Sequence, residues 1–411
     1  MIWIENSIQP NVPLNHVTVL GTIRGNIQPE TFEQAFAELV TRHEALRAKV
    51  IDTTNGPRYC VPEEHVGQIS LVDLSGEPDP SSAYQRWIEN RCRKILEFDQ
   101  RLYDAALIRV REEEFVFFLN QNHIISDGSS TLLLFRELGE IYLQILSGHQ
   151  RETPLAEVHP YSEFIRETSK YTTSEQSAKS RAFWSERFSS SLPFVSYYGR
   201  NAANSKLLTT RITRRLGADL SRAVHDMGRL KPPFIVFITV LIAYLRRVTL
   251  NDDICIGVPF HNRTPTFADT VGLLMEVVPY LISVDSEDTL DSLLRKVRNE
   301  TRAIKEHRRH TISARLAPYD VILNYRPESL ATFAGFPLTY DVTNPLNLIG
   351  SGQSCGGHSV RREGHESLRV EIKHTDDDEI FRVTFDFDVG IWPDAAERER
   401  AADHFLTLIA A

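Results

Sequence analysis

The chain has 411 residues, of which 42% are hydrophobic and 25% are charged. This composition is typical of a globular protein, and the length suffices for two hydrophobic cores, so disordered and fibrous classes are excluded. The 46 Lys and Arg against 55 Asp and Glu give a net charge of −9. That balance predicts no binding to nucleic acid or to an anionic membrane through general electrostatic attraction.

The sequence predicts a cytoplasmic protein. Its longest apolar run, Phe234 to Leu245, is shorter than the roughly 20 residues that a membrane-spanning helix needs. The N-terminal segment has no basic stretch ahead of an apolar core, so a secretory signal is not expected. The cysteines are widely spaced and predict neither a disulfide framework nor a metal site; they are Cys60, Cys92, Cys255 and Cys355.

The first half of the chain alternates strand and helix patterns. A strand is predicted over Val17 to Ile23, followed by an amphipathic helix from Pro29 to Arg47. A hairpin over Ala106 to Leu119 has a polar turn at 111–114, and its second strand runs on to Asn122. After a polar turn, residues 131–146 keep a helical apolar face behind a serine N-cap.

The second half repeats this mixture of strands and helices. A polar stretch near residue 170 is the best candidate for a boundary, which predicts two mixed α/β lobes at 1–170 and 171–411. Strands are expected at 207–215, 253–260, 277–284, 319–325, 368–374 and 381–389, and helices at 216–227, 233–248, 290–307 and from 394 onward.

The clearest chemical motif is the segment from Asn122 to Gly128, NHIISDG, between a strand end and a helix start. A neutral histidine at such a junction can accept a proton from a nucleophile, which makes His123 a candidate general base. Backbone amides at the following helix start can stabilise developing negative charge. Physical reasoning alone leaves open whether His123 is catalytic or a buried structural histidine.

Asp127 is expected to be structural, because a buried carboxylate requires an arginine partner. The candidates for that partner are Arg42, Arg47 and Arg263.

Several motifs, in the same order along the whole chain, resemble those of one superfamily. TRHEALRAKV (41–50) resembles an RHExLR segment, and NHIISDG is similar to HHxxxDG with Asn122 at the first histidine. Further resemblances lie in IGVPFHNR (256–263), VGLLMEVVPYLISVD (271–285) and APYDVILNY (317–325). The sequence thus resembles the condensation domains of nonribosomal peptide synthetases, which are related to chloramphenicol acetyltransferase.

This resemblance implies an α/β fold of two chloramphenicol acetyltransferase-like lobes, each a mixed sheet with flanking helices, arranged as a V-shaped internal pseudo-dimer in a monomer. The implied reaction joins an acyl thioester to an amine, or to a hydroxyl, and forms an amide or ester. The implied partners are donor and acceptor carrier proteins, which present substrates on phosphopantetheine; CoA is the other possible donor. No permanently bound cofactor or metal is implied.

The resemblance also assigns residues. It makes His123 the catalytic histidine, pairs Asp127 with an arginine, and puts the Gly128 amide near the thioester oxygen. Arg263 and Arg47 stand at matching positions. Asn122 departs from the family pattern, but an amide retains hydrogen-bonding capacity, so we expect activity to survive.

Other departures concern the acceptor side and the ends of the chain. Glu276, Leu281 and the segment 306–313 differ from the family pattern, which leaves acceptor specificity open. The resemblance begins at Met1–Trp3 and no further module follows, so a free-standing and an excised domain are both possible.

Alternative functions remain open. One is an acyl-CoA-dependent O-acyltransferase, and another is a non-catalytic docking platform. REGHESL (362–368) is similar to an epimerization motif but lies too late in the chain, so Glu363 and His365 are read as part of a solvated loop. A solvated face in helical or basic surroundings is expected for His225, Asp226, His307 and His310. The glycines Gly350, Gly352, Gly356 and Gly357 lack the flanking strand and helix of a phosphate site.

Overall fold

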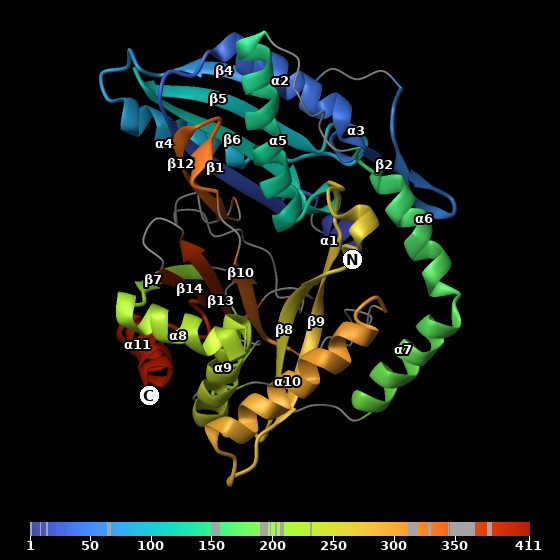
Figure 1. The fold of residues 1–411 in the computed structure, drawn as a ribbon, viewed down its shortest axis with the longest axis vertical. Coiled ribbons are helices and arrows are strands. Elements are labelled where there is room, and N and C mark those ends of the chain that lie inside the picture. Colours follow the sequence, from blue (N-terminus) through green and yellow to red (C-terminus); the bar gives the residue numbers. More distant parts are fainter. Residues whose placement is uncertain are drawn as a thin grey trace. The chain divides into compact units, whose positions relative to one another are not determined.

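The computed structural model (Figure 1) divides into two units that each combine a sheet with helices. Unit 1 comprises Met1–Ser169, Arg263–Leu274 and Leu330–Gln353; unit 2 comprises Lys170–Asn262, Met275–Ser329 and Ser354–Ala411. The structure describes residues 2–8, 10–13, 15–63, 67–148, 157–189, 196–197, 199–201, 204–205, 209–230, 232–310, 319–327, 330–343, 345, 366–375 and 380–411.

Unit 1 is built on a six-stranded sheet with strand order β11-β12-β1-β6-β5-β4. The neighbouring strands are antiparallel except for β4 and β5, which are parallel. The strands are β1 (His16–Arg24), β4 (Ser70–Asp73), β5 (Tyr103–Arg111), β6 (Glu114–Asn122), β11 (Thr332–Phe333) and β12 (Phe336–Thr343). A separate hairpin joins β2 (Lys49–Thr53) to β3 (Gly56–Cys60).

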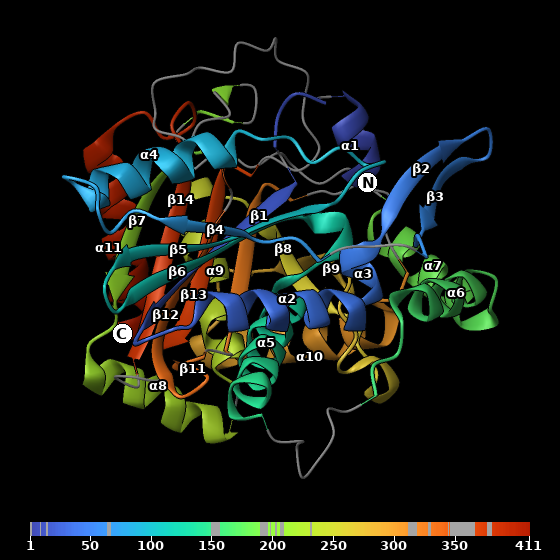
Figure 2. The same cartoon turned by 90° about the horizontal axis from the view of Figure 1, so that it is seen from above.

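Helices cover both faces of this sheet, as Figure 2 shows. On one face lie α2 (Pro29–Arg42) and α5 (Gly128–Ser147), where Phe117 of β6 packs against Phe32 and Phe135. On the other face α4 (Pro80–Cys92) places Trp87 against Phe118. Because β6 is buried on both faces, Phe115–Leu119 in this strand form a continuous apolar run rather than an alternating one. The remaining helices are α1 (Ile2–Ile8), α3 (Glu44–Arg47) and α6 (Tyr161–Thr172), which leads into unit 2.

Unit 2 contains a second six-stranded sheet, of order β7-β14-β13-β10-β8-β9, in which β10 runs parallel to β13 and β8. The strands are β7 (Thr209–Arg215), β8 (Asp253–His261), β9 (Met275–Ser283), β10 (Val321–Arg326), β13 (Leu368–Thr375) and β14 (Ile380–Asp388). The helices are α7 (Glu175–Arg187), α8 (Ala218–Leu230), α9 (Pro233–Thr249), α10 (Leu290–His307) and α11 (Ala395–Ala410). All eight residues from Ile235 to Ile242 in α9 are buried, which explains the long apolar sequence of this helix.

The predicted fold class, mixed α/β with flanking helices on each sheet, is confirmed. The contiguous lobes 1–170 and 171–411 remain a prediction. The two compact units of the structure are not contiguous, because the segments Arg263–Leu274 and Leu330–Gln353 belong to unit 1. Within the described residues, no helix combines the length and the apolar character needed to cross a membrane.

Two local predictions were wrong. The helix predicted over Pro29 to Arg47 is interrupted at His43, whose backbone is extended (φ −103°, ψ 108°). The break buries the His43 imidazole, with Nε2 3.1 Å from the Glu137 carboxylate. The N-cap of α5 is Asp127 rather than a serine, because its carboxylate accepts a hydrogen bond from the Ser130 amide.

Candidate active site

The turn that carries His123 links β6 to α5 and is held from two sides. Residues His123–Ile125 form a short 3-10 turn (η1), which the Asn122 side chain caps by accepting a hydrogen bond from the Ile124 amide at 3.0 Å. The His123 amide donates to the carbonyl of Asn15, just ahead of β1, at 2.7 Å. His123 is partly exposed, whereas Asn122 is fully buried. The backbone of the candidate base is therefore fixed while its side chain retains access.

Asp127 is 3% exposed and forms a two-point ion pair with Arg263. Arg263 Nη1 donates to Oδ2 at 2.7 Å and Nη2 donates to Oδ1 at 2.9 Å. The amides of Ser130 and Leu274 also donate to this carboxylate, at 2.8 and 2.9 Å. Burial alone would raise the pKa of Asp127, but the Arg263 charge and these hydrogen bonds outweigh it and hold the pKa below its usual range.

Ser130 fastens the segment Arg263–Leu274 to the first turn of α5. Its hydroxyl donates to the Gly272 carbonyl at 2.7 Å, and it accepts from the Gly272 amide at 3.0 Å and from Arg263 Nη2 at 2.8 Å. A Cβ on Gly272 would lie 2.3 Å from Cδ2 of Tyr161. The segment Arg263–Leu274 can therefore approach the Tyr161 ring of α6 this closely only because residue 272 has no side chain. Two stretches of chain far apart in sequence thereby form one polar centre.

The other two candidate arginines lie elsewhere in unit 1. Arg42 Nε donates to Glu137 at 2.6 Å, and this carboxylate also contacts His43. Burial would raise the pKa of Glu137, but His43 and Arg42 lower it below its usual value. Arg47 lies near Tyr59, and its buried Nε finds no hydrogen-bond partner in the described part of the chain. Of the three candidate arginines, Arg263 is the one that forms the ion pair with Asp127.

Gly128 is the exposed first residue of α5. The first amides of a helix have no partner within the helix and point along its axis, which is the arrangement that favours a negatively charged oxygen. The turn and helix start thus bring together a histidine, a run of amides and a carboxylate already neutralised by arginine. This set can remove a proton from a nucleophile and stabilise an oxyanion.

Sequence reasoning missed His16, the first residue of β1. The strand was predicted to begin at Val17, so the direct pairing of His16 with Asn122 was not foreseen. Burial lowers the pKa of His16 to about 4. The signal that could have found it is the continuation of the strand pattern by one residue.

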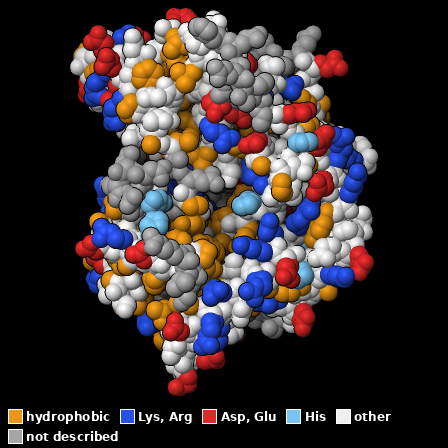
Figure 3. Space-filling view, viewed as in Figure 1, with side chains coloured by type: hydrophobic (Ala, Val, Ile, Leu, Met, Phe, Trp, Pro, Cys, Tyr) orange, Lys and Arg blue, Asp and Glu red, His pale blue; other side chains and the backbone are white. Residues whose placement is uncertain are grey.

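A row of basic side chains marks α10 in unit 2. Arg295, Arg298, Arg302 and Lys305, here called the basic stripe, recur at the spacing of one helix face and are exposed. Figure 3 shows Lys and Arg side chains gathered over this helix. None of the four forms an ion pair with another residue that the structure describes. On a chain of net charge −9, the stripe is a local site of attraction for anions.

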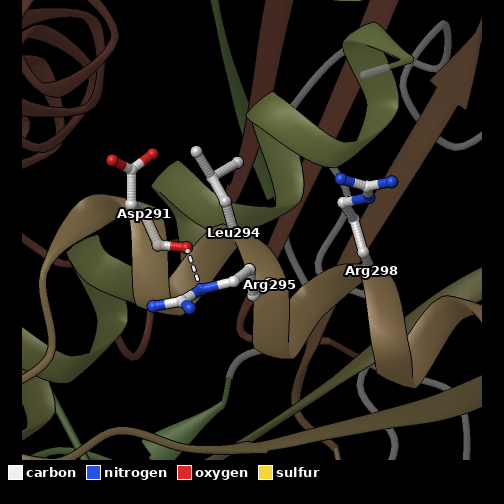
Figure 4. Close-up of a pocket in the computed structure, with 4 residues that line it drawn as sticks. All are labelled: Asp291, Leu294, Arg295 and Arg298. Atoms are coloured by element: carbon white, nitrogen blue, oxygen red, sulfur yellow. Dashed lines mark hydrogen bonds between the residues drawn. The ribbon is translucent and has the colours of Figure 1, made fainter. Parts of the chain in front are cut away.

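A hollow opens beside the basic stripe (Figure 4). It is lined by Asp291, Leu294, Arg295 and Arg298, and Arg295 Nε lies 3.4 Å from the carbonyl of Asp291. Figure 4 shows the two guanidinium groups pointing apart, with that of Arg295 turned toward Asp291.

Glu276, which departs from the family pattern, lies at the start of β9. Burial raises the pKa of this carboxyl to about 7, and Oε2 has no hydrogen-bond partner within the described residues. Leu281 lies in the same strand.

The expectation that His225 and His307 are solvated was wrong. His225 Nε2 lies 2.9 Å from His374 Nε2 and its ring stacks on Phe381. The His307 ring stacks on Phe183. His310 is likewise only partly exposed, whereas Asp226 is exposed as expected. Residues 311–313, most of 362–368, Cys355 and the four glycines from 350 to 357 lie outside the described residues.

Comparison with known proteins identifies one family. A family model described as "Condensation domain" matches residues 2–313. The chain is 28% identical over 303 residues to malpinin synthetase of Mortierella alpina, covering 71% of this chain and 4% of that protein. To isonitrile lipopeptide synthase of Streptomyces coeruleorubidus it is 22% identical over 403 residues, covering 96% and 26%. The chain therefore spans a small fraction of the length of these relatives.

Solved structures show the same fold. The starter condensation domain of rhizomide synthetase, in complex with C8-CoA, has a TM-score of 0.82 at 20% identity and covers 100% of this chain and 93% of that one. The first condensation domain of the CDA synthetase has the same TM-score, identity and coverage.

Proposed function

Because the chain belongs to the condensation-domain family, whose members are acyltransferase-type enzymes that form amide bonds, we propose that it joins a carrier-bound acyl thioester to an amine in nonribosomal peptide synthesis. The observation that carries the proposal is the turn that holds His123 beside an Asp127 locked to Arg263. Hybrid peptide–polyketide synthesis would use the same step.

In the proposed mechanism His123 acts as general base. As the amine nitrogen attacks the thioester carbon, the imidazole accepts its proton, and the carbonyl oxygen becomes an oxyanion. The Gly128 amide at the start of α5 would stabilise that oxygen. The new C–N bond remains when the C–S bond breaks, and the leaving thiolate takes up a proton to become a thiol.

Asp127 supports this site without carrying a proton. Its carboxylate is occupied by Arg263, Ser130 and Leu274, and its pKa is below the usual range, so it is ionised at neutral pH. It therefore fixes the start of α5, which determines the direction of the helix amides. Asn122 fills the structural role of the family's first histidine, because its amide already caps the turn.

We propose that the donor and acceptor partners are carrier proteins and that one of them docks along the basic stripe. The phosphopantetheine arm contains a phosphodiester, an anion that the arginines of the basic stripe would attract. Changing Arg302→Glu should raise KM for a carrier-bound donor at least about fivefold, with KM for a short thioester lacking phosphate unchanged. Arg222→Glu, an exposed charge reversal on α8, is the matched control. Equal KM values for the two variants would remove this docking surface.

Two other activities remain candidates for the same site. Use of an acyl-CoA donor is favoured by the relative solved with C8-CoA. An alcohol acceptor needs the base more than an amine does, so ester formation fits the same histidine. A docking platform without activity would not need the histidine.

The test is intact-mass measurement of acyl-loaded carrier proteins mixed with the chain and a panel of amines and alcohols, beside acyl-CoA. Condensed product from the carrier alone, lost in His123→Ala and retained in His404→Ala, supports the proposal; His404 is an exposed histidine on α11. Discharge of CoA instead assigns a free O-acyltransferase. No discharge in the presence of the native carriers leaves the docking platform.

A further inference from the structure

The beginning of β1 and the end of β6 form a buried polar corner in unit 1. His16 of β1 pairs directly with Asn122 of β6, and Thr18 pairs with Asn120. Directly paired residues of antiparallel strands project to the same face with Cβ atoms about 4.5–5.5 Å apart. On this face Phe118 and Val116 of β6 pack in one cluster with Cys92, the last residue of α4. The four polar residues are each no more than 2% exposed.

This corner holds a donor and an acceptor that lack partners. Within the described residues, Asn122 Nδ2, Asn120 Nδ2 and His16 Nδ1 are buried without a hydrogen bond. Of the two donors, Asn122 Nδ2 belongs to the residue that pairs directly with His16. An amide nitrogen only donates, and a neutral imidazole accepts through one ring nitrogen. Burial keeps His16 neutral at physiological pH by lowering its pKa to about 4. Asn122 Nδ2 and His16 Nδ1 are therefore chemically complementary, and leaving both without a hydrogen bond is costly.

The corner is connected to the turn that carries His123 through two hydrogen bonds. The other side-chain atom of Asn122, Oδ1, accepts from the Ile124 amide and caps the turn that begins at His123. The carbonyl of Asn15, adjacent to His16, accepts from the His123 amide. A change in the Asn122 rotamer would release the first bond, and a shift of the β1 start would release the second.

We propose that His16 is a positioning residue for His123. It accepts a hydrogen bond from Asn122 Nδ2 through one buried water, and so holds the Asn122 amide in the orientation that caps the turn. The part of this inference that concerns turnover rests on the proposed function. The contact itself rests on the strand register and on the two unsatisfied atoms.

The pairing predicts that the two side chains are exchangeable. In the double variant His16→Asn/Asn122→His, an amide and an imidazole again face each other across the same strand pair. A neutral imidazole at position 122 can accept from the Ile124 amide through one ring nitrogen, which keeps the cap, and donate from the other to the side-chain amide at position 16. Either single exchange gives two amides or two imidazoles, which changes both the volume and the donor–acceptor match. The single variants should therefore be impaired and the double variant restored.

The experiment compares the wild type with both single exchanges, the double exchange and Thr18→Val. Thr18 is a buried neighbour on the same strand face, but its hydroxyl donates to Asn120 rather than to the turn. We expect each single exchange to lower kcat at least about tenfold with KM within twofold, because a small misplacement of a catalytic group has such an effect. The double exchange should return kcat to within about threefold of the wild type, and Thr18→Val should stay within twofold.

A second readout does not depend on turnover. In protein labelled with 15N-histidine, the His123 ring resonances should move in each single exchange, return in the double exchange and remain in place in Thr18→Val. Wild-type protein without turnover would refute the proposed function, while these resonances would still test the contact. Multiplicative effects of the two exchanges on kcat, or unmoved His123 resonances in the singles, would overturn the inference.

Discussion

Breaking the ion pair between Arg263 and Asp127 should destabilise unit 1 strongly. The pair is buried, with side-chain exposures of 9% and 1%, and each oxygen of Asp127 receives a guanidinium hydrogen bond. Removing one member leaves the other as an uncompensated buried charge, which costs about 3–5 kcal/mol. Asp127→Asn is the informative change, because its amide oxygen can still cap Ser130 and the loss then reports the charge pair.

Thermal unfolding at pH 7, followed by calorimetry, measures this effect. For a unit of this size, about 3–5 kcal/mol corresponds to a fall in midpoint of roughly 6–20 °C. Arg263→Met should have a similar effect. The double variant Asp127→Asn/Arg263→Met should be less destabilised than the sum of the singles, because no unpaired charge remains.

The pH dependence provides a second check with a definite sign. The pKa of Asp127 is depressed in the folded chain, so its contribution to stability is complete above the ordinary carboxyl pKa of about 3.9. The contribution is lost as pH falls through the folded-state value. The difference between the wild type and Asp127→Asn should therefore be constant from pH 5 to 8 and shrink below pH 4. A loss under about 1 kcal/mol at pH 7, or additivity in the double variant, would refute the reasoning.

Two further changes test packing and burial. Burial raises the pKa of Asp320 to about 7. Between about pH 4 and 7 the folded chain therefore retains a proton that the unfolded chain releases, so stability falls as pH rises through this range. Asp320→Asn should raise the thermal midpoint at pH 8 and leave it unchanged at pH 4. Gly272→Ala should lower the free energy of unfolding by about 1–3 kcal/mol, because the new methyl meets the Tyr161 ring. Gly76→Ala, where no atom lies within 4 Å of the new methyl, is its control and should stay within about 0.5 kcal/mol in chemical denaturation.

The elements of unit 1 could be predicted where a local pattern decides them. The β5–β6 hairpin and the body of α5 follow from β-branched, aromatic and helical spacing. The break at His43 could not, since the apolar spacing of α2 continues into α3 and the interruption depends on Glu137 from another helix. Local periodicity contains no information about that contact.

The candidate site divides in the same way. The motif from Asn122 to Gly128 identifies the turn, because its residue types and flanking elements are contiguous in the chain. The choice of Arg263 over Arg42 and Arg47 depends on a contact between residues 136 positions apart. Three arginines satisfied the chemical requirement, and only the three-dimensional path of the segment Arg263–Leu274 distinguishes them.

The discontinuity of unit 1 has a consequence for synthesis of the protein on the ribosome. When the first 170 residues have emerged, Asp127 has no Arg263, Ser130 has no Gly272, and β1 lacks its neighbour β12. The nascent sheet then exposes one edge of β1 and contains an unpaired buried acid, two features that oppose stable folding. The polar centre around Asp127 is therefore completed only after residue 274 has left the exit tunnel, and the sheet of unit 1 only after residue 343. A fragment ending near residue 170 should remain chaperone-bound or aggregate rather than accumulate as a folded lobe.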